Sequence, residues 1–281
     1  MKVVVFGASN QIGHFLLPRL QERGENVVAI SRQAHADASD VTWLKGQLPD
    51  AVPDIQNLSA AICFGPLLPF AQWLATIDPP PSMRVIATSS MSAESKEASD
   101  VPAERGVSQM LREGEAALAA VCERRGYPWT VFRPTLIYGA GLDKSLSPIA
   151  RRAMRQRVFP LLAGRGLRQP VHADDIAKAV MAALDQLEAA GRVLPLGGGE
   201  RLPVSEMFAR VRGSLPVATL PVPLPAWLLR LGRHAVPRLR GPLTRLEANL
   251  IADNSDVQRL LGISPRPFRP DAACWTPPRS S

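Results

Sequence analysis

The first thirteen residues, MKVVVFGASNQIG, constrain the fold of this chain more than any other stretch. Val3 to Phe6 form a run of β-branched and aromatic side chains, which predicts a short buried strand. Gly7 ends this run, and the apolar spacing from Ile12 to Leu20 predicts a helix. A strand that enters a helix through a glycine-bounded turn leaves backbone N–H groups and the positive end of the helix dipole facing one point. The opening therefore predicts a site for the pyrophosphate of a dinucleotide.

The polar and glycine positions of this opening have an informative spacing. Gly7, Asn10 and Gly13 match a G-x-x-G-x-x-G turn in which asparagine replaces the middle glycine. Asparagine adopts positive φ more readily than most residues, so we expect Asn10 to preserve the turn in that way. The predicted cofactor-binding residues lie in this turn and at the ends of the strands that follow it: Gly7, Ser9, Asn10, Gln11, Ile12, Gly13, Ser31, Arg32, Phe64, Gly65, Pro66 and Thr88.

The end of the predicted second strand bears on the choice of cofactor. Asn26 to Ile30 form this strand, and Ser31 and Arg32 follow it. An NAD site usually has an acidic residue here for the ribose 2′-hydroxyl, whereas a cation suits a 2′-phosphate. The sequence therefore favours NADP(H) over NAD(H). The alternative interpretation of Arg32 is an ordinary solvent-exposed arginine.

Further apolar runs alternate with helical patterns along the chain. Strands are predicted at Val41 to Lys45, Ser59 to Phe64, Arg84 to Thr88 and Trp129 to Arg133. This alternation predicts an α/β protein with a doubly wound parallel sheet, the Rossmann fold. Ligands of such sheets lie beyond the carboxyl ends of the strands. Residues 63–66 and 88–92 should therefore face the same crevice as residues 7–13.

Composition excludes several classes of protein. The hydrophobic content of 46% is sufficient for a full core, and three distant cysteines without C-x-x-C spacing indicate neither a disulfide framework nor a metal site. The net charge of +8 arises mainly after residue 200, but no nucleic-acid-binding motif accompanies it, so no nucleic-acid partner is expected. Apolar runs are too short for a signal peptide or a transmembrane segment, and a cytoplasmic location is expected. The oligomeric state stays open.

Five motifs in order resemble the short-chain dehydrogenase/reductase superfamily, in its extended or atypical branch of NAD-dependent epimerase/dehydratase type. They are GASNQIG in the opening, TSS at 88–90, WTVFRPTLIYGAGLD at 129–143, RQPVHADDIAKAV at 168–180 and LGISPRPFRP at 261–270. The resemblance implies an NAD(P)-binding core over residues 1–142, completed by about 168–196. It also implies a smaller lobe, made of residues 143–167 and 197–281, that binds a substrate or a partner.

One departure from the family concerns catalysis. The resemblance implies a Tyr-x-x-x-Lys pair on the helix after the serine-bearing strand, with tyrosine as the general acid/base. The corresponding helix here is 106–124, and matching Glu115 to the family's acid places Val107 and Leu111 where tyrosine and lysine would stand. Both catalytic groups are absent. An apolar stripe instead predicts a core-facing side for this helix: Val107, Met110, Leu111, Gly114, Leu118 and Val121.

Other residues match the family's substrate region. Ser90 matches the serine that polarises the substrate, and Tyr138 is a second candidate catalytic residue or a structural tyrosine. His172 is interpreted first as a turn residue and only secondarily as a replacement acid/base. Asp174 and Asp175 are expected to cap the helix that follows.

Basic segments point to an anionic substrate or a partner. Arginines cluster in the region where the family receives substrate diphosphates, although a solvated helix face also explains them: Arg151, Arg152, Arg155, Arg157, Arg165 and Arg168. Residues 221–245 are apolar and basic, which suits a cap over the crevice, a membrane surface or a protein partner.

Two functions follow from these observations. The first is an NADP(H)-dependent enzyme, an oxidoreductase, epimerase or dehydratase that uses a non-standard acid/base on a carbonyl or nucleotide-linked substrate. The second is a non-catalytic dinucleotide-binding protein, either a redox sensor or a partner-binding scaffold. Preserved crevice motifs favour the first, and the missing Tyr/Lys pair favours the second.

Overall fold

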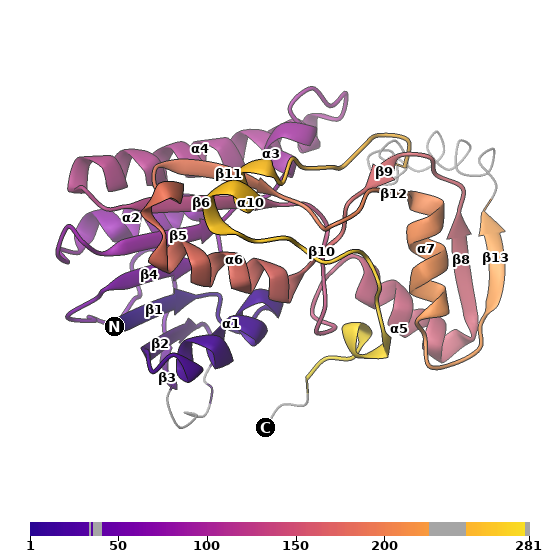
Figure 1. Ribbon diagram of the computed structural model, residues 1–281, viewed down its shortest axis with the longest axis horizontal. Coiled ribbons are helices and arrows are strands. Elements are labelled where there is room, and N and C mark those ends of the chain that lie inside the picture. Colours follow the sequence, from indigo (N-terminus) through magenta and orange to yellow (C-terminus); the bar gives the residue numbers. More distant parts are fainter. Residues whose placement is uncertain (34, 36–40, 225–245, 279–281) are drawn as a thin grey trace.

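A central sheet of seven parallel strands dominates the computed structural model, which describes residues 1–33, 35, 41–224 and 246–278. The strand order is β11-β6-β5-β4-β1-β2-β3 (Figure 1). The strands span Lys2–Phe6 (β1), Asn26–Ser31 (β2), Val41–Lys45 (β3), Ala60–Cys63 (β4), Arg84–Thr88 (β5), Trp129–Pro134 (β6) and Arg192–Leu196 (β11). This arrangement confirms the predicted α/β class and its Rossmann sheet.

Helices cover both faces of the sheet, which explains why its strands are apolar on both sides. The covering helices are α1 (Gln11–Glu22) and α6 (Ala173–Asp185) on one face, and α2 (Leu67–Thr76) and α4 (Pro102–Arg125) on the other (Figure 1). In β1, Val3 and Val5 pack in the cluster that contains α1 and α6, whereas Val4 and Phe6 pack in the cluster that contains α2 and α4. Alternate residues of one strand therefore build two separate cores.

A smaller lobe lies beyond the carboxyl ends of the strands, on the right of Figure 1. Its own core contains Phe159, Met207 and Phe208. Its elements are β7 (Ile137–Tyr138), α5 (Leu146–Gln156), β8 (Val158–Leu162), β9 (Leu167–Arg168), β10 (Val171–His172), β12 (Leu202–Pro203), α7 (Val204–Gly213) and β13 (Leu220–Leu224). Four short elements complete the described chain: α3 (Ser92–Ser95), η1 (Leu187–Ala189), α10 (Ser255–Leu261) and η3 (Ala272–Trp275).

Residues 264–278, here called the C-terminal strap, join the two lobes. Arg266 contacts both carboxylates at the start of α6, with its Nη2 2.8 Å from Asp175. Burial would raise the pKa of Asp174, but hydrogen bonds from Arg19 and Arg266 outweigh it and lower the pKa to about 2. Farther along, the Trp275 indole N–H donates to Ser214 at 2.7 Å. The strap is therefore attached to the core at one end and to the smaller lobe at the other.

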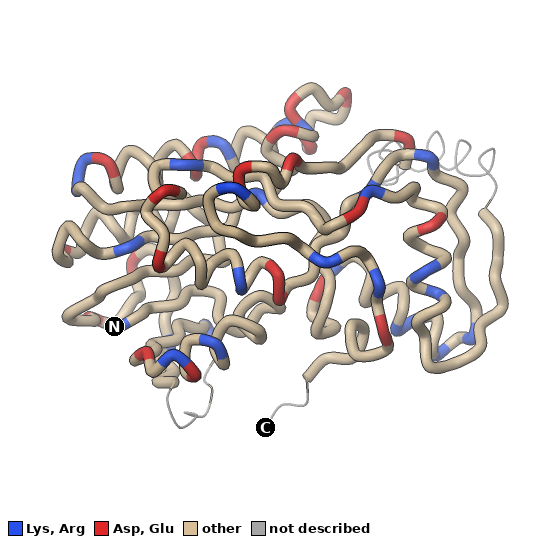
Figure 2. Tube along the Cα trace, in the orientation of Figure 1, with Lys and Arg blue, Asp and Glu red and all other residues tan. Residues whose placement is uncertain are grey.

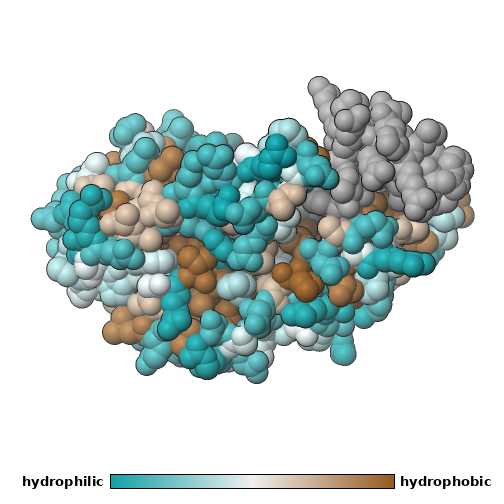
Figure 3. Space-filling view, turned by 90° about the horizontal axis from the view of Figure 1, so that it is seen from above, coloured by the Kyte–Doolittle hydropathy of each residue, from teal (hydrophilic) through white to brown (hydrophobic). Residues whose placement is uncertain are grey.

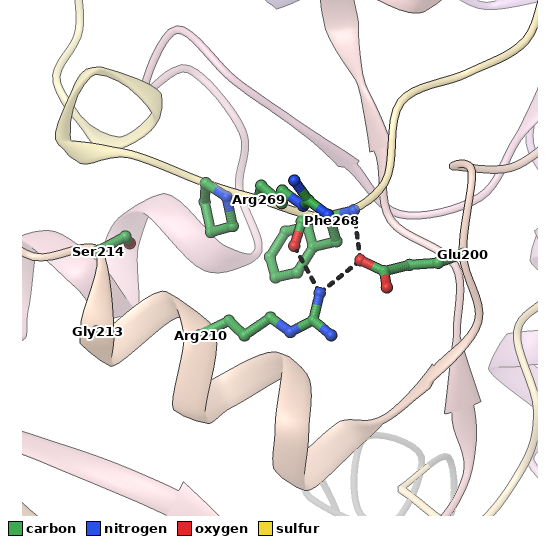
Figure 4. A pocket seen from close by; sticks show the side chains of 7 residues that line it. Glu200, Arg210, Gly213, Ser214, Phe268 and Arg269 are labelled. Atoms are coloured by element: carbon green, nitrogen blue, oxygen red, sulfur yellow. Dashed lines mark hydrogen bonds and ion pairs between the residues drawn. The ribbon is translucent and has the colours of Figure 1, made fainter.

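A cluster on the smaller lobe holds the middle of the strap (Figure 4). The Phe268 backbone N–H donates to Glu200 at 2.7 Å, and the Arg210 guanidinium donates to the Phe268 carbonyl at 2.9 Å. Glu200 also pairs with Arg210 at 2.5 Å, so the three residues bond one another. The Arg210 guanidinium is thus hydrogen-bonded within the protein.

Charged and apolar residues are intermixed in the two views of Figures 2 and 3. Basic and acidic residues alternate along both lobes (Figure 2), and the face seen from above mixes hydrophobic and hydrophilic side chains (Figure 3). Among the helices that the structure describes, none has the length and hydropathy needed to cross a membrane. Cys63, Cys122 and Cys274 are free and buried.

Candidate functional site

The turn between β1 and α1 requires glycine at two positions. Gly7 has a φ of +74°, a conformation that side chains other than glycine rarely adopt. Gly13 lies so close to the preceding turn that a Cβ atom would be 1.9 Å from the Ala8 carbonyl oxygen. The chain therefore folds tightly back on itself at the carboxyl end of β1, which brings the amino end of α1 to the edge of the sheet.

Asn10 stabilises this turn differently from what the sequence suggested. Its φ is −84° and its ψ is 178°, so the expected positive φ is wrong. Instead, its side-chain Oδ1 accepts the backbone N–H groups of Ile12 at 2.8 Å and Gly13 at 2.9 Å. Asn10 is the N-cap of α1. Two N–H groups that would face a pyrophosphate are already hydrogen-bonded within the chain.

Replacing Asn10 with glycine is expected to tighten dinucleotide binding, by less than about twofold. A bound pyrophosphate would no longer compete with the Asn10 carboxamide for the Ile12 and Gly13 N–H groups, and exchange of such a cap for glycine is worth a few tenths of a kcal/mol. Calorimetric titration with NADPH measures the change. The control is Asn57→Gly, the same substitution at an exposed loop residue, which should leave the affinity at the wild-type value. Weaker binding by Asn10→Gly would instead identify the carboxamide as a cofactor contact.

The ends of neighbouring strands lie beside the glycine turn. β4 lies beside β1, and the Phe64 backbone N–H donates to the Phe6 carbonyl at 3.0 Å. This contact places Phe64 and the following Gly65 and Pro66 next to the glycine turn. Thr88 ends β5, the next strand, and is buried. These predicted cofactor residues therefore follow adjacent strands of one sheet edge.

The end of β2 carries three polar side chains. Ser31 Oγ accepts the Gln33 backbone N–H at 3.2 Å and lies 3.1 Å from His35 Nε2. The His35 ring packs on Trp43, with ring centroids 4.3 Å apart. Arg32 is exposed and forms no ion pair with any residue that the structure describes.

Ser90 lies just beyond β5. The Ser89 backbone N–H donates to the Phe132 carbonyl at 2.7 Å, so this segment continues beside β6. Ser90 Oγ accepts the Ser92 backbone N–H at 3.1 Å, which leaves its own hydroxyl proton available to a substrate oxygen. Ser89 Oγ is buried without a partner in the described residues.

Helix α4 is oriented by a buried ion pair one turn after Leu111. The Arg133 guanidinium of β6 donates to Glu115 at 2.9 Å, and this hydrogen bond raises the pKa of Arg133. Val107 and Leu111 are half-buried on this helix, and neither side chain can transfer a proton. Met110 is 59% exposed, so the predicted apolar stripe is wrong at this position. The buried residue nearest the start of the helix is Ser108, which donates to the Ala93 carbonyl.

Tyr138 and His172 pack edge to face, with ring centroids 5.0 Å apart. Burial raises the pKa of Tyr138, which disfavours the ionised form needed for a base. Burial and nearby Arg266 lower the pKa of His172. His172 Nδ1 accepts the Asp174 backbone N–H at 3.1 Å, so His172 is the N-cap of α6. The expected capping by Asp174 and Asp175 is wrong, because both lie within the first turn.

The arginines of the smaller lobe bond mainly within the protein. Arg151 donates to the Gly141 carbonyl, Arg152 to Gln156 at 2.8 Å, and buried Arg168 to the Ala248 carbonyl at 2.6 Å. Three others are exposed: Arg155, Arg157 and Arg165. Of the basic segment 221–245, only residues 221–224 belong to the described chain. The described residues contain no histidine, cysteine or acidic cluster suited to a metal ion.

The parallel sheet and the glycine turn at its edge define a fold of the Rossmann class. Residues 92–197 match the sequence model described as the NAD dependent epimerase/dehydratase family. This match confirms the resemblance drawn from the motifs.

One curated relative and several solved structures are similar to this chain. UDP-glucose 4-epimerase of Vibrio cholerae is 24% identical over 161 residues, which are 54% of this chain and 47% of that protein. The chain thus spans about half the length of this relative.

The solved structures share the fold at low identity. MoeE5 in complex with UDP-glucuronic acid and NAD has a TM-score of 0.70 at 19% identity, with 95% of this chain and 94% of that chain covered. UDP-glucuronic acid 4-epimerase from Bacillus cereus in complex with NAD has a TM-score of 0.69 at 16% identity, with 94% of each chain covered.

Proposed function

We propose that this chain is an NADP(H)-binding enzyme of the epimerase/dehydratase type, acting on a carbonyl or nucleotide-linked substrate. The observation that carries this proposal is the tight Gly7–Gly13 turn at the edge of a seven-stranded parallel sheet, with the Ser90 hydroxyl two strands away. The solved relatives are named as complexes with NAD and with UDP-glucuronic acid, which supports a dinucleotide and a nucleotide sugar here. Three free buried thiols suit a reducing cytoplasm.

The preference for NADP(H) rests on Arg32. It follows β2, where the ribose of the dinucleotide adenosine is held in this fold, and it has no described ion-pair partner. A guanidinium binds a phosphate through charge-assisted hydrogen bonds, which are worth about 1.5–3 kcal/mol. A cation at this position, without an ion-pair partner among the described residues, therefore supports recognition of a 2′-phosphate, whereas the solved relatives named above contain NAD.

Calorimetric titration of the full chain with NADPH and NADH tests this proposal. NADPH is expected to bind at least about tenfold more tightly than NADH, and Arg32→Ala is expected to remove the difference. Arg259→Ala on α10 is the matched control, because Arg259 is exposed and belongs to another surface. Equal affinities for both cofactors in the wild type would contradict the 2′-phosphate assignment. Absence of binding by either cofactor would contradict the dinucleotide site itself.

A second function, a non-catalytic redox sensor or scaffold, is supported by Val107 and Leu111. Neither residue can supply the proton that a carbonyl requires during hydride transfer. Adding UDP-glucose to protein loaded with oxidised cofactor separates the two functions. An enzyme of the proposed type transiently reduces the nicotinamide, which changes its absorbance, whereas a sensor or scaffold leaves the cofactor oxidised.

A further inference from the structure

A cavity of about 420 Å³ lies outside the dinucleotide crevice, where α1, β7, β10 and the C-terminal strap meet. His14 and Phe15 of α1 line one side of it, and Arg269 of the strap lines another. None of the predicted cofactor residues belongs to its wall. We propose that this cavity is a second binding site, for a small anion that carries a carboxylate or phosphate on an apolar body.

Two hydrogen-bond donors on the cavity wall, neither with a partner in the described chain, carry this inference. His172 is 9% exposed, and its Nδ1 already accepts a backbone N–H. The neutral imidazole therefore has its proton on Nε2, which forms no hydrogen bond to any described residue. The Tyr138 hydroxyl, on a side chain that is 1% exposed, also lacks a partner in the described chain. Neither donor atom is fully enclosed by the described residues, so both are accessible to a hydrogen-bond acceptor in the cavity that they line.

The charges around the cavity favour an anion as that acceptor. Arg269 is exposed and has no ion-pair partner among the residues that the structure describes. Arg266 also lines the wall, but Asp174 and Asp175 hold its guanidinium. One acid, Asp271, also lines the wall, and its carboxylate caps η3 by accepting the Cys274 backbone N–H at 3.1 Å. Arg269 is thus the cation left to balance a ligand.

The apolar part of the wall and the volume of the cavity indicate the size and the apolar part of the ligand. Phe15, Ala140 and Pro278 contribute apolar parts of the wall. The Phe15 ring packs against His172 with centroids 5.1 Å apart, so an apolar surface adjoins the imidazole donor. The volume lies within the range of about 300–1,000 Å³ that small-molecule sites occupy. A compact acid with one ring matches both the wall and the volume.

Titration of the full chain with benzoate and phenyl phosphate tests this site, and neutral benzyl alcohol serves as the comparison probe. We expect both anions to bind saturably and the alcohol not to bind. Changes in the NMR chemical shifts of the protein measure binding. Arg269→Ala should weaken binding about tenfold, and the near-isosteric Tyr138→Phe about fivefold. Arg165→Ala, which removes an exposed arginine outside the cavity, should have no effect.

Several results would overturn the inference. They are absence of saturable binding, equal binding of benzyl alcohol, or unchanged affinity in Arg269→Ala. Competition between the probes and saturating NADPH would show that they enter the crevice instead, and would also overturn it. Probe binding that persists in a protein with no affinity for NADPH would support this site while contradicting the proposed function.

Discussion

The double substitution Val107→Tyr, Leu111→Lys is expected to raise the rate of hydride transfer about 10²- to 10⁴-fold over the wild type. Residues four apart lie on one face of α4, and both positions are half-buried. Glu115, one turn farther, is held by Arg133, so this face of the helix has a fixed orientation. A tyrosine there would accept the hydroxyl proton as UDP-glucose transfers its hydride to the oxidised nicotinamide, and the lysine would lower the pKa of that tyrosine. Single-turnover reduction of bound NADP⁺ or NAD⁺ by UDP-glucose measures the rate.

The outer face of the same helix provides a matched control. Gln109 and Glu113 are exposed, four residues apart and bonded to each other at 2.8 Å. Gln109→Tyr with Glu113→Lys introduces the same side chains at the same spacing, and should leave the rate unchanged. Equal rates in the two double variants would contradict a catalytic position for 107 and 111. Unfolding of the first double variant alone would show that these positions face the core, which would contradict the alignment on Glu115.

Substitution of Gly13 by alanine is expected to weaken NADPH binding about 100-fold and to lower the free energy of unfolding by about 1–3 kcal/mol. The new Cβ would lie 1.9 Å from the Ala8 carbonyl oxygen, so the turn must open and the amino end of α1 must move. Backbone N–H groups that are displaced in this way no longer converge on a pyrophosphate. Calorimetric titration and urea unfolding measure the two effects.

Gly106 offers the same substitution in a helix without the steric conflict. A Cβ at this position of α4 has no heavy atom within 4 Å. Gly106→Ala should therefore stabilise the protein by about 0.5–1 kcal/mol, because alanine loses less backbone entropy in a helix. Its NADPH affinity should equal that of the wild type. Wild-type affinity in Gly13→Ala would show that the turn is not the pyrophosphate site.

The strands were predictable because burial on both faces leaves a strong sequence pattern. Val41 to Lys45 was predicted as the third strand and is β3 in the structure. Helix faces were less predictable, since periodicity identifies an apolar side but not how far a neighbouring helix extends over it. α2 packs at Gly114, where a Cβ would lie 3.0 Å from Leu67, but Met110 is exposed one turn earlier. The predicted stripe is therefore wrong at Met110, whereas Val107 and Leu111 are half-buried and its later residues are buried.

The spacing of residues in the sequence does not determine which hydrogen-bond partners the side chains of the candidate site have. Asn10 was correctly placed in the turn, yet positive φ and side-chain capping are both open to asparagine, and the structure has the second. At α6, the two aspartates were expected to cap the helix, whereas Arg19 and Arg266 draw their carboxylates into ion pairs. These arginines are distant in sequence, so local spacing gave no signal for them. The cavity beside the strap was missed for the same reason.

The order of strands has a consequence for how the protein is made. β11 pairs with β6 in parallel, but α5, β8, β9 and α6 lie between these two strands in the sequence. During synthesis on a ribosome, β6 therefore emerges with one edge unpaired and stays so while half of the smaller lobe is translated. α6, which covers one face of the sheet beside α1, also arrives late. The sheet of the larger lobe therefore cannot be completed until the first half of the smaller lobe has been translated.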